Sequence, residues 1–79
     1  MTNLERYLNI FADTFGIDPS KPADLEYQSI KEWDSVGHMG LIAGIEDAFH
    51  IMMDTDDIID FSSLEKGKQI LRKYDVIID

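Results

Sequence analysis

Residues 33–49 read WDSVGHMGLIAGIEDAF, a stretch that combines a helix-start signal with a helical apolar face. Asp34 is a favoured N-cap residue, which predicts a helix that begins there and runs to about Phe49. On a helical wheel, one broad arc of this segment is apolar: Leu41, Ile42, Ile45, Ala48 and Phe49. This arc is the predicted core face of the helix.

Another amphipathic helix is predicted near the N-terminus. Its apolar residues recur at intervals of four, three and four positions: Leu4, Leu8, Phe11 and Phe15. Thr2 and Glu5 form the capping-box pattern that begins a helix, and Gly16 is expected to end it. Tyr7 and Ile10 lie beside the apolar face.

Two shorter helices are predicted in the C-terminal half of the chain. One fits Asp54 to about Phe61, with Asp54 as its cap. The other begins at a second capping-box pattern, Ser62-Ser63-Leu64-Glu65, and runs to about Tyr74. One face of this last helix is predicted to carry four residues: Leu64, Gly67, Leu71 and Tyr74.

Between the first two helices, residues 16–33 are predicted to form a long ordered loop. Pro19 and Pro22 break helix there. Five apolar residues are expected to pin the loop to the core: Ile17, Leu25, Tyr27, Ile30 and Trp33. A loop of this length in a small domain tends to be functional. The prediction is an all-α fold, with residues 1–79 as one domain: a four-helix bundle with a long loop between its first two helices and a short third helix.

Composition excludes several classes of function. The 79 residues include 7 Lys and Arg against 16 Asp and Glu, a formal net charge of −9. This charge disfavours nucleic acid and anionic lipid as partners and favours basic protein surfaces. Without cysteine, the chain has no disulfide, thiolate metal site or cysteine nucleophile. No segment approaches about 20 apolar residues and no signal peptide is evident, so we expect a cytoplasmic protein that does not insert into membranes. We also expect it to be a monomer.

A second apolar strip follows Asp34 on the same helix as the core arc, beside two acidic residues. It consists of Val36, Met39 and Ala43, with Glu46 and Asp47 at its margin. The strip is either a second core contact or an exposed docking surface, and composition does not decide between them. Residues 34–60 contain seven acidic residues and no Lys or Arg, a distribution that favours a basic partner.

The stretch from residue 33 to residue 49 resembles the signature of the acyl carrier protein family. That family has Asp-Ser-Leu at the start of an apolar helix that ends in an acidic pair and Phe. Here Asp34-Ser35-Val36 is followed by Leu41, then by Glu46-Asp47 and Phe49. The predicted order of helices, the length and the acidity extend the resemblance over the whole chain.

The resemblance implies that Ser35 is the attachment site of 4′-phosphopantetheine, which a separate phosphopantetheinyl transferase would transfer from coenzyme A. The arm would carry acyl cargo as a thioester between acyl-loading and acyl-processing enzymes, in fatty-acid biosynthesis or in specialised lipid, polyketide or polysaccharide-related pathways. The chain itself would not be an enzyme. Asp34 would serve as N-cap and as part of the surface that the transferase recognises. The implied partner-docking residues are Val36, Met39, Ala43, Glu46 and Asp47.

Three residues depart from the family pattern. Gly40 stands where many members have Glu, Gly37 where many have Asp, and Trp33 replaces a small residue. These changes indicate partners in specialised pathways rather than the housekeeping fatty-acid enzymes. Gly37, Gly40 and Gly44 lie within about 60° on the wheel. We interpret them as kept for a partner or cargo rather than for the fold, and the alternative is drift on a solvated face. His38, at the edge of the core arc, is expected to be structural or solvated.

Other classes of function fit the sequence less well than a carrier. A catalytic triad of Ser35, His38 and Asp34 is disfavoured because residues three apart on one helix cannot supply both a base and its orienting acid. A calcium loop from Asp54 lacks the glycine needed at its sixth position, which is Ile59. The acidic residues in and before the predicted third helix are Asp54, Asp56, Asp57 and Asp60. The resemblance implies that they bind divalent cations weakly and nonspecifically, and that the chain has no defined metal site. An aminoacyl or peptidyl carrier and an unmodified acidic interaction module remain alternatives.

Overall fold

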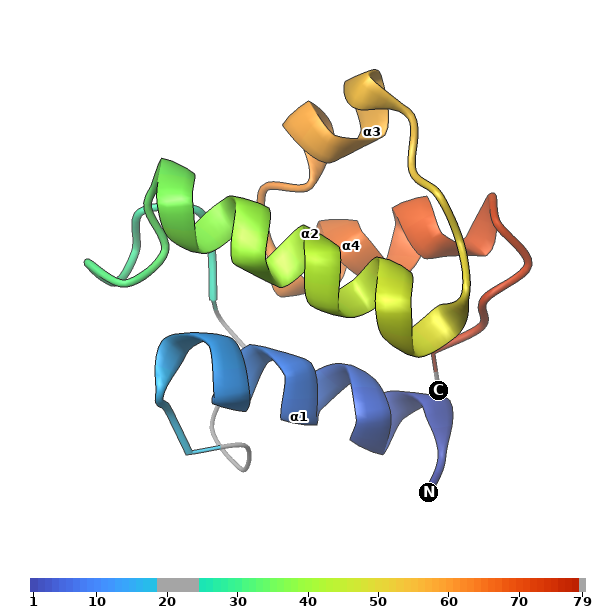
Figure 1. The fold of residues 1–79 in the computed structure, drawn as a ribbon, viewed down its shortest axis with the longest axis horizontal. Helices are drawn as coiled ribbons and strands as arrows, with labels where there is room; N and C mark the ends of the chain where they lie inside the picture. The colour runs from blue at the N-terminus through green and yellow to red at the C-terminus, as the bar shows by residue number, and fades with distance from the viewer. Residues whose placement is uncertain (19–24, 79) are drawn as a thin grey trace.

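The computed structural model describes residues 1–18 and 25–78. Its helices in these ranges are α1 (Asn3–Phe15), α2 (Ser35–Phe49), α3 (Thr55–Asp60) and α4 (Leu64–Arg72). Figure 1 shows α1 and α2 side by side and antiparallel, and in this view α2 lies between α1 and α3. The described part of the chain has no strand, and none of its helices is long and apolar enough to cross a membrane. The predicted all-α fold with a short third helix is confirmed.

The first two helices begin at the predicted caps. The Thr2 hydroxyl accepts a hydrogen bond from the Glu5 amide at 3.1 Å, and the Thr2 amide donates to the Glu5 carboxylate at 3.0 Å. This reciprocal pair is the predicted capping box. Asp34 Oδ1 accepts from the Gly37 amide at 2.8 Å and caps α2 in the same way. Gly16 ends α1 in the left-handed conformation, with φ of 67°.

The caps of the two C-terminal helices differ from the prediction. Ser63, not Ser62, is the N-cap of α4, and its hydroxyl accepts from the Lys66 amide at 2.9 Å. The helix begins one residue late because the Ser62 carbonyl is engaged by the Tyr27 amide at 2.7 Å, in the short bridge that joins the loop to the start of α4. Asp54 does occupy the N-cap position of α3, but its side chain makes no cap hydrogen bond.

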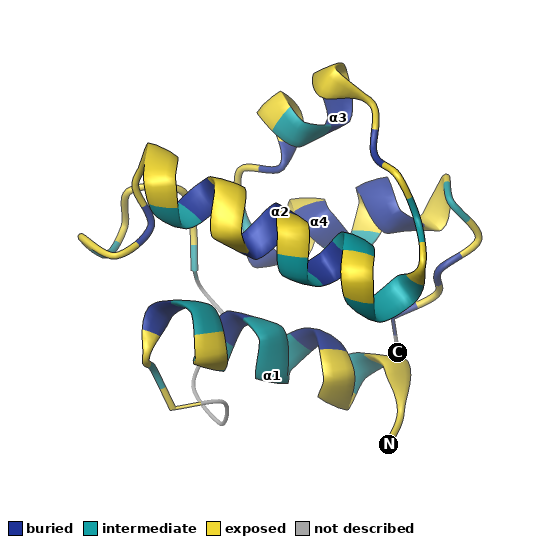
Figure 2. Cartoon of the chain, in the orientation of Figure 1, coloured by how far each residue is buried: buried dark blue, intermediate teal, exposed yellow. Residues whose placement is uncertain are grey.

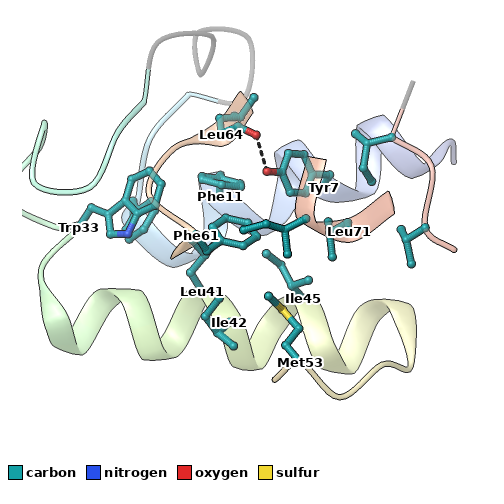
Figure 3. Packing of buried hydrophobic residues seen from close by; sticks show 14 residues of the cluster. Tyr7, Phe11, Trp33, Leu41, Ile42, Ile45, Met53, Phe61, Leu64 and Leu71 are labelled. Carbon is teal, nitrogen blue, oxygen red and sulfur yellow. Dashed lines mark hydrogen bonds between the residues drawn. The ribbon is translucent and has the colours of Figure 1, made fainter. Parts of the chain in front are cut away.

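The core combines aromatic rings from α1 with aliphatic side chains from α2 and α4 (Figure 3). The buried hydrophobic residues are Tyr7, Phe11, Phe15, Trp33, Leu41, Ile42, Ile45, Met53, Phe61, Leu64, Ile70, Leu71, Val76 and Ile78. Within the predicted arc of α2, Leu41, Ile42 and Ile45 are buried as expected. Ala48 and Phe49, in the last turn of α2, are only half-buried, and Figure 2 colours much of that turn as intermediate. None of the buried hydrophobic residues belongs to α3.

A buried hydrogen bond and a glycine bring α4 close to α1. The Tyr7 hydroxyl donates to the Leu64 carbonyl at 2.6 Å, drawn as a dashed line in Figure 3. Burial raises the pKa of the Tyr7 phenol, so this donor keeps its proton. A Cβ at Gly67 would overlap the Phe61 ring and the Tyr7 hydroxyl oxygen. Only glycine therefore fits at this contact between the helices.

The loop before α2 is pinned mainly by Trp33, which has no exposed surface. Its ring packs against Phe11 and Phe15, with ring centroids 5.5 and 5.3 Å apart respectively. Three of the other predicted loop anchors are half-buried: Ile17, Leu25 and Ile30. Tyr27 is more than a third exposed, so its prediction as a core anchor is wrong. The predicted helix breakers Pro19 and Pro22 lie outside the described residues.

Candidate functional site

Ser35 is the first residue of α2, and its side chain is exposed. Asp34 fixes the turn on which it lies: the carboxylate of Asp34 accepts from the Gly37 amide, and the carbonyl accepts from the His38 amide, each at 2.8 Å. No hydrogen bond joins the Ser35 hydroxyl to another residue in the ranges 1–18 and 25–78. Ser35 is therefore presented to solvent by a capped helix start.

His38 joins the loop, α2 and α3. Its Nδ1 lies 2.9 Å from the Trp33 indole Nε1, and its Nε2 lies 2.7 Å from the Ile58 carbonyl oxygen. The two rings are nearly coplanar, with an interplanar angle of 15° and centroids 6.2 Å apart. The residue as a whole is 9% exposed. Of the two predicted alternatives, structural or solvated, His38 is therefore structural.

A pocket of about 390 Å³ opens beside Ser35, between the start of α2, the loop and α3. Its most buried lining residues are Phe61 and His38, and we call these the floor. Ile58 is half-buried, and the remaining lining residues form an exposed rim: Tyr27, Ser35, Met39, Ile59 and Ser62. Both ring nitrogens of His38 are already bonded to protein, so the floor offers no free hydrogen-bonding group. The pocket thus suits an apolar ligand.

The apolar strip on α2 is exposed. Val36 is 80% exposed and Met39 is 57% exposed, and Ala43 and Asp47 also face solvent. The alternative that this strip is a second core contact is therefore wrong. We define the exposed strip as Val36, Met39, Ala43 and Asp47, a small apolar surface with an acidic margin.

Glu46 differs from the other predicted docking residues. It is half-buried, and its carboxylate accepts a hydrogen bond from the Met53 amide at 2.8 Å. This bond ties the end of α2 to the segment that leads into α3. Glu46 thus has a structural role that the sequence did not indicate.

The glycines of α2 do not act as one set. A Cβ at Gly37 would overlap the Glu32 carbonyl oxygen, and one at Gly44 would lie 3.1 Å from the Ile10 side chain. Both glycines therefore allow close packing, against the loop and against α1, and our interpretation that they were kept for a partner rather than for the fold is wrong. Gly40 is exposed, and a Cβ there would meet only the Thr14 methyl group at an ordinary 3.8 Å.

The acidic residues around α3 include one that is not solvated. Asp57 is buried, and its carboxylate accepts hydrogen bonds from Lys73 Nζ and from the Tyr74 hydroxyl, each at 2.5 Å. These bonds, that of Lys73 first, hold the pKa of Asp57 below its usual range. The expectation that Asp57 belongs to a loose cation-binding surface is wrong, because its oxygens are already engaged. No group of three or more His, Asp or Glu side chains in the described ranges is placed to hold a metal ion.

Ser35, His38 and Asp34, the triad that the sequence analysis disfavoured, do not form a catalytic triad in the structure. The Asp34 carboxylate bonds the Gly37 amide, and both ring nitrogens of His38 are bonded to Trp33 and Ile58, so Ser35 has no hydrogen-bonded base. Three residues that line the pocket were not predicted as site residues: Ile59, Phe61 and Ser62. No sequence signal placed them beside Ser35, because only the path of the chain through α3 brings them there.

Comparison with known proteins gives no match, whether to protein-family models, to curated proteins or to solved structures. The candidate site therefore rests on the residues and on their geometry. Its parts are an exposed serine on a capped helix start, an adjoining apolar pocket and the exposed strip, apolar with an acidic margin, along the same helix.

Proposed function

We propose that this chain is an acyl carrier protein, which holds acyl intermediates as thioesters on a 4′-phosphopantetheine arm attached to Ser35. The observation that carries the proposal is the exposed Ser35 hydroxyl on the first turn of α2, at the rim of an apolar pocket. That the arm is 4′-phosphopantetheine is inferred from the resemblance of residues 33–49 to the family signature. The chain would carry cargo in the cytoplasm and leave the chemistry to its partner enzymes.

The position of Ser35 suits a phosphodiester. The first amides of α2 have no partner within the helix, and the helix dipole places partial positive charge at this end. A phosphate on the Ser35 hydroxyl would meet these groups, as anions do at other helix starts. Asp34 already bonds the Gly37 amide, so it holds the turn in shape and leaves the serine free. The transferase would then bind a preformed surface around Asp34 and Ser35.

The pocket beside Ser35 suits the cargo of such an arm. Its floor offers no free polar group, so an apolar acyl chain could enter without leaving buried groups unpaired. An aminoacyl or peptidyl cargo would bring an amine or amide into the same space. The intact mass of the protein purified from its native host would identify the cargo and separate these two kinds of carrier.

The first prediction concerns modification at Ser35. Incubation of the unmodified protein with coenzyme A and a promiscuous phosphopantetheinyl transferase should add one phosphopantetheine, detected by intact-mass spectrometry. Ser35→Ala should abolish the addition, because it removes the only proposed nucleophile. Ser62→Ala is the matched control: it removes an exposed hydroxyl from the same pocket rim and should leave the addition unchanged.

Two results would contradict the proposal. One is addition that persists in Ser35→Ala, which would place the arm elsewhere. The other is the absence of any addition to the wild-type protein with several transferases. That second result would favour the unmodified acidic interaction module.

We propose that partner enzymes dock on the exposed strip through basic surfaces. The second prediction is that Asp47→Lys slows association with the transferase several-fold at low ionic strength, and that added salt reduces the difference from wild type. Asp47 is chosen because it is exposed, whereas a change at Glu46 would also break the bond to Met53. Asp13→Lys makes the same charge change on the exposed side of α1. Equal slowing by both variants would mean that net charge, not the strip, controls docking.

A further inference from the structure

The pocket beside Ser35 does not extend into the core. Its described lining residues come from the loop, from the start of α2, and from the second half of α3 with the residues that follow it, and none of them belongs to α1 or α4. On α2 the lining ends at Met39. The core residues further along this helix are almost completely buried and do not line the pocket: Leu41, Ile42 and Ile45. A ligand in the pocket is therefore separated from the core.

His38 forms the barrier between the pocket and the core. Its Nδ1 accepts a hydrogen bond from the Trp33 indole N–H at 2.9 Å. Because that indole nitrogen is a donor, the other ring nitrogen, Nε2, is the one that donates, and it lies 2.7 Å from the Ile58 carbonyl oxygen. This second bond joins α2 to α3. Carbon atoms need about 3.5–4.0 Å to a neighbouring atom, so no methylene group fits between the two bonded atoms.

The groups around the imidazole hold it in place. Trp33 and Phe61 have no exposed surface, and the Phe61 ring lies 6.3 Å from the imidazole, centroid to centroid. The Tyr27 ring meets the imidazole edge-on from the loop, with centroids 5.6 Å apart. If the imidazole turned aside, the buried indole N–H of Trp33 would lose its acceptor, which is costly. His38 is therefore a fixed barrier.

Ile42 is the core residue that this barrier separates from the pocket. It follows His38 by four positions, so the two side chains lie one turn apart on the same face of α2. His38 lines the pocket, whereas Ile42 is 1% exposed and belongs to the core cluster. A shorter side chain at position 38 would extend the pocket toward Ile42.

The size of the pocket limits what it can enclose. A methylene group takes up about as much space as a water molecule, ~30 Å³, so a pocket of about 390 Å³ holds about a dozen such groups at most. Its rim is exposed, so fewer than these are shielded from water. We propose that His38 is a specificity-determining residue, which stops the pocket short of the core and restricts its ligand to a short acyl group. That the ligand is an acyl group rests on the proposed function, whereas the position of the stop does not.

The first test maps where a short apolar probe binds to the full unmodified chain. The probe is octanol, which is uncharged, so the net charge of −9 does not repel it. Methyl signals of isoleucine report on both sides of the barrier, because Ile58 and Ile59 line the pocket and Ile42 and Ile45 lie in the core cluster. We expect saturable shifts of the Ile58 and Ile59 methyl signals and none of the Ile42 and Ile45 signals. Shifts of all four, or of none, would overturn the proposal.

Two substitutions at position 38 separate the barrier from a merely structural role. His38→Ala removes the barrier, and octanol should then also shift the Ile42 methyl signal. His38→Gln keeps a longer side chain whose amide can donate to the Ile58 carbonyl, so it should retain the wild-type pattern. A residue needed only for stability would not change which methyl groups respond. A folded His38→Ala variant with the wild-type pattern would contradict the proposal, and the wild-type map decides it even if that variant does not fold.

The second test concerns the length of the cargo. Acetyl, octanoyl and hexadecanoyl arms are added to Ser35 from the corresponding coenzyme A thioesters, and the melting temperatures of the three forms are compared. The octanoyl form should melt roughly 5 °C above the acetyl form, since enclosing the chain stabilises the native state, and the hexadecanoyl form should melt no higher. A clearly higher value for hexadecanoyl would overturn the length limit but leave the carrier function standing. If no arm can be added, the carrier function fails, and the octanol map still decides whether His38 is the stop.

Discussion

Replacing Trp33 with alanine is expected to lower the free energy of unfolding by about 3–5 kcal/mol. Trp33 is the largest fully buried side chain of the domain, and its ring contacts both Phe11 and Phe15 of α1. The change removes these contacts and also leaves Nδ1 of His38 without its donor. A chain of this size has a total stability of about 4–12 kcal/mol, so the substitution should remove at least about a quarter of it.

Urea unfolding followed by far-ultraviolet circular dichroism measures this loss of stability. The method does not depend on tryptophan fluorescence, which the variant lacks. Tyr27→Ala is the matched control, since Tyr27 lies in the same loop and its ring contacts Trp33, with ring centroids 6.4 Å apart. It is more than a third exposed, and we expect its removal to cost about 1 kcal/mol. If the two variants lost similar stability, the loop would not be pinned mainly by Trp33, and its placement before α2 would need another explanation.

Local signals in the sequence predicted most of the fold. The Thr2 capping box and the Asp34 cap each use atoms within four residues of one another, so the starts of α1 and α2 follow from short-range chemistry. The apolar arc of α2 is likewise a local pattern, and it correctly identified Leu41, Ile42 and Ile45 as buried. The exposure of Ser35 could be anticipated for the same reason, as the residue after an N-cap.

Contacts between distant segments account for the errors. The start of α4 was displaced by one residue because Ser62 bonds Tyr27, which lies 35 positions earlier in the sequence. Asp57 looked like part of a solvated acidic run, yet Lys73 and Tyr74 reach it from beyond α4. No period or cap pattern marks such pairs, because they depend on how the helices are arranged.

The pocket was unpredictable for the same reason. Ser35 and Ser62 both line it, although the sequence places them in different helical segments. His38 looked like an edge position of α2, and only the positions of Trp33 and Ile58 show that it bridges two segments. The candidate site therefore divides into a serine and cap that local sequence predicts, and a pocket that only the fold assembles.

Replacing Gly67 with alanine is the second change expected to have a large effect on stability. A Cβ at this position would overlap the Phe61 ring and the Tyr7 hydroxyl oxygen, and neither group can move freely. Phe61 is fully buried, and the Tyr7 hydroxyl is fixed by its 2.6 Å bond to the Leu64 carbonyl. We expect a loss of about 3 kcal/mol, at the upper end of the cost of overpacking a core. This loss would exceed the gain of about 1 kcal/mol that alanine brings to a helix interior.

Gly40→Ala isolates that gain in the same protein. Gly40 is also inside a helix, but a Cβ there has open space apart from the Thr14 methyl group at 3.8 Å, so we expect stability to rise by about 0.5–1 kcal/mol. Opposite signs for the two substitutions in urea unfolding would show that Gly67 is required for the approach of α4 to α1. A Gly67→Ala variant as stable as Gly40→Ala would mean that α4 can withdraw from α1 at no cost. The Tyr7 bond would then not be what holds the two helices together.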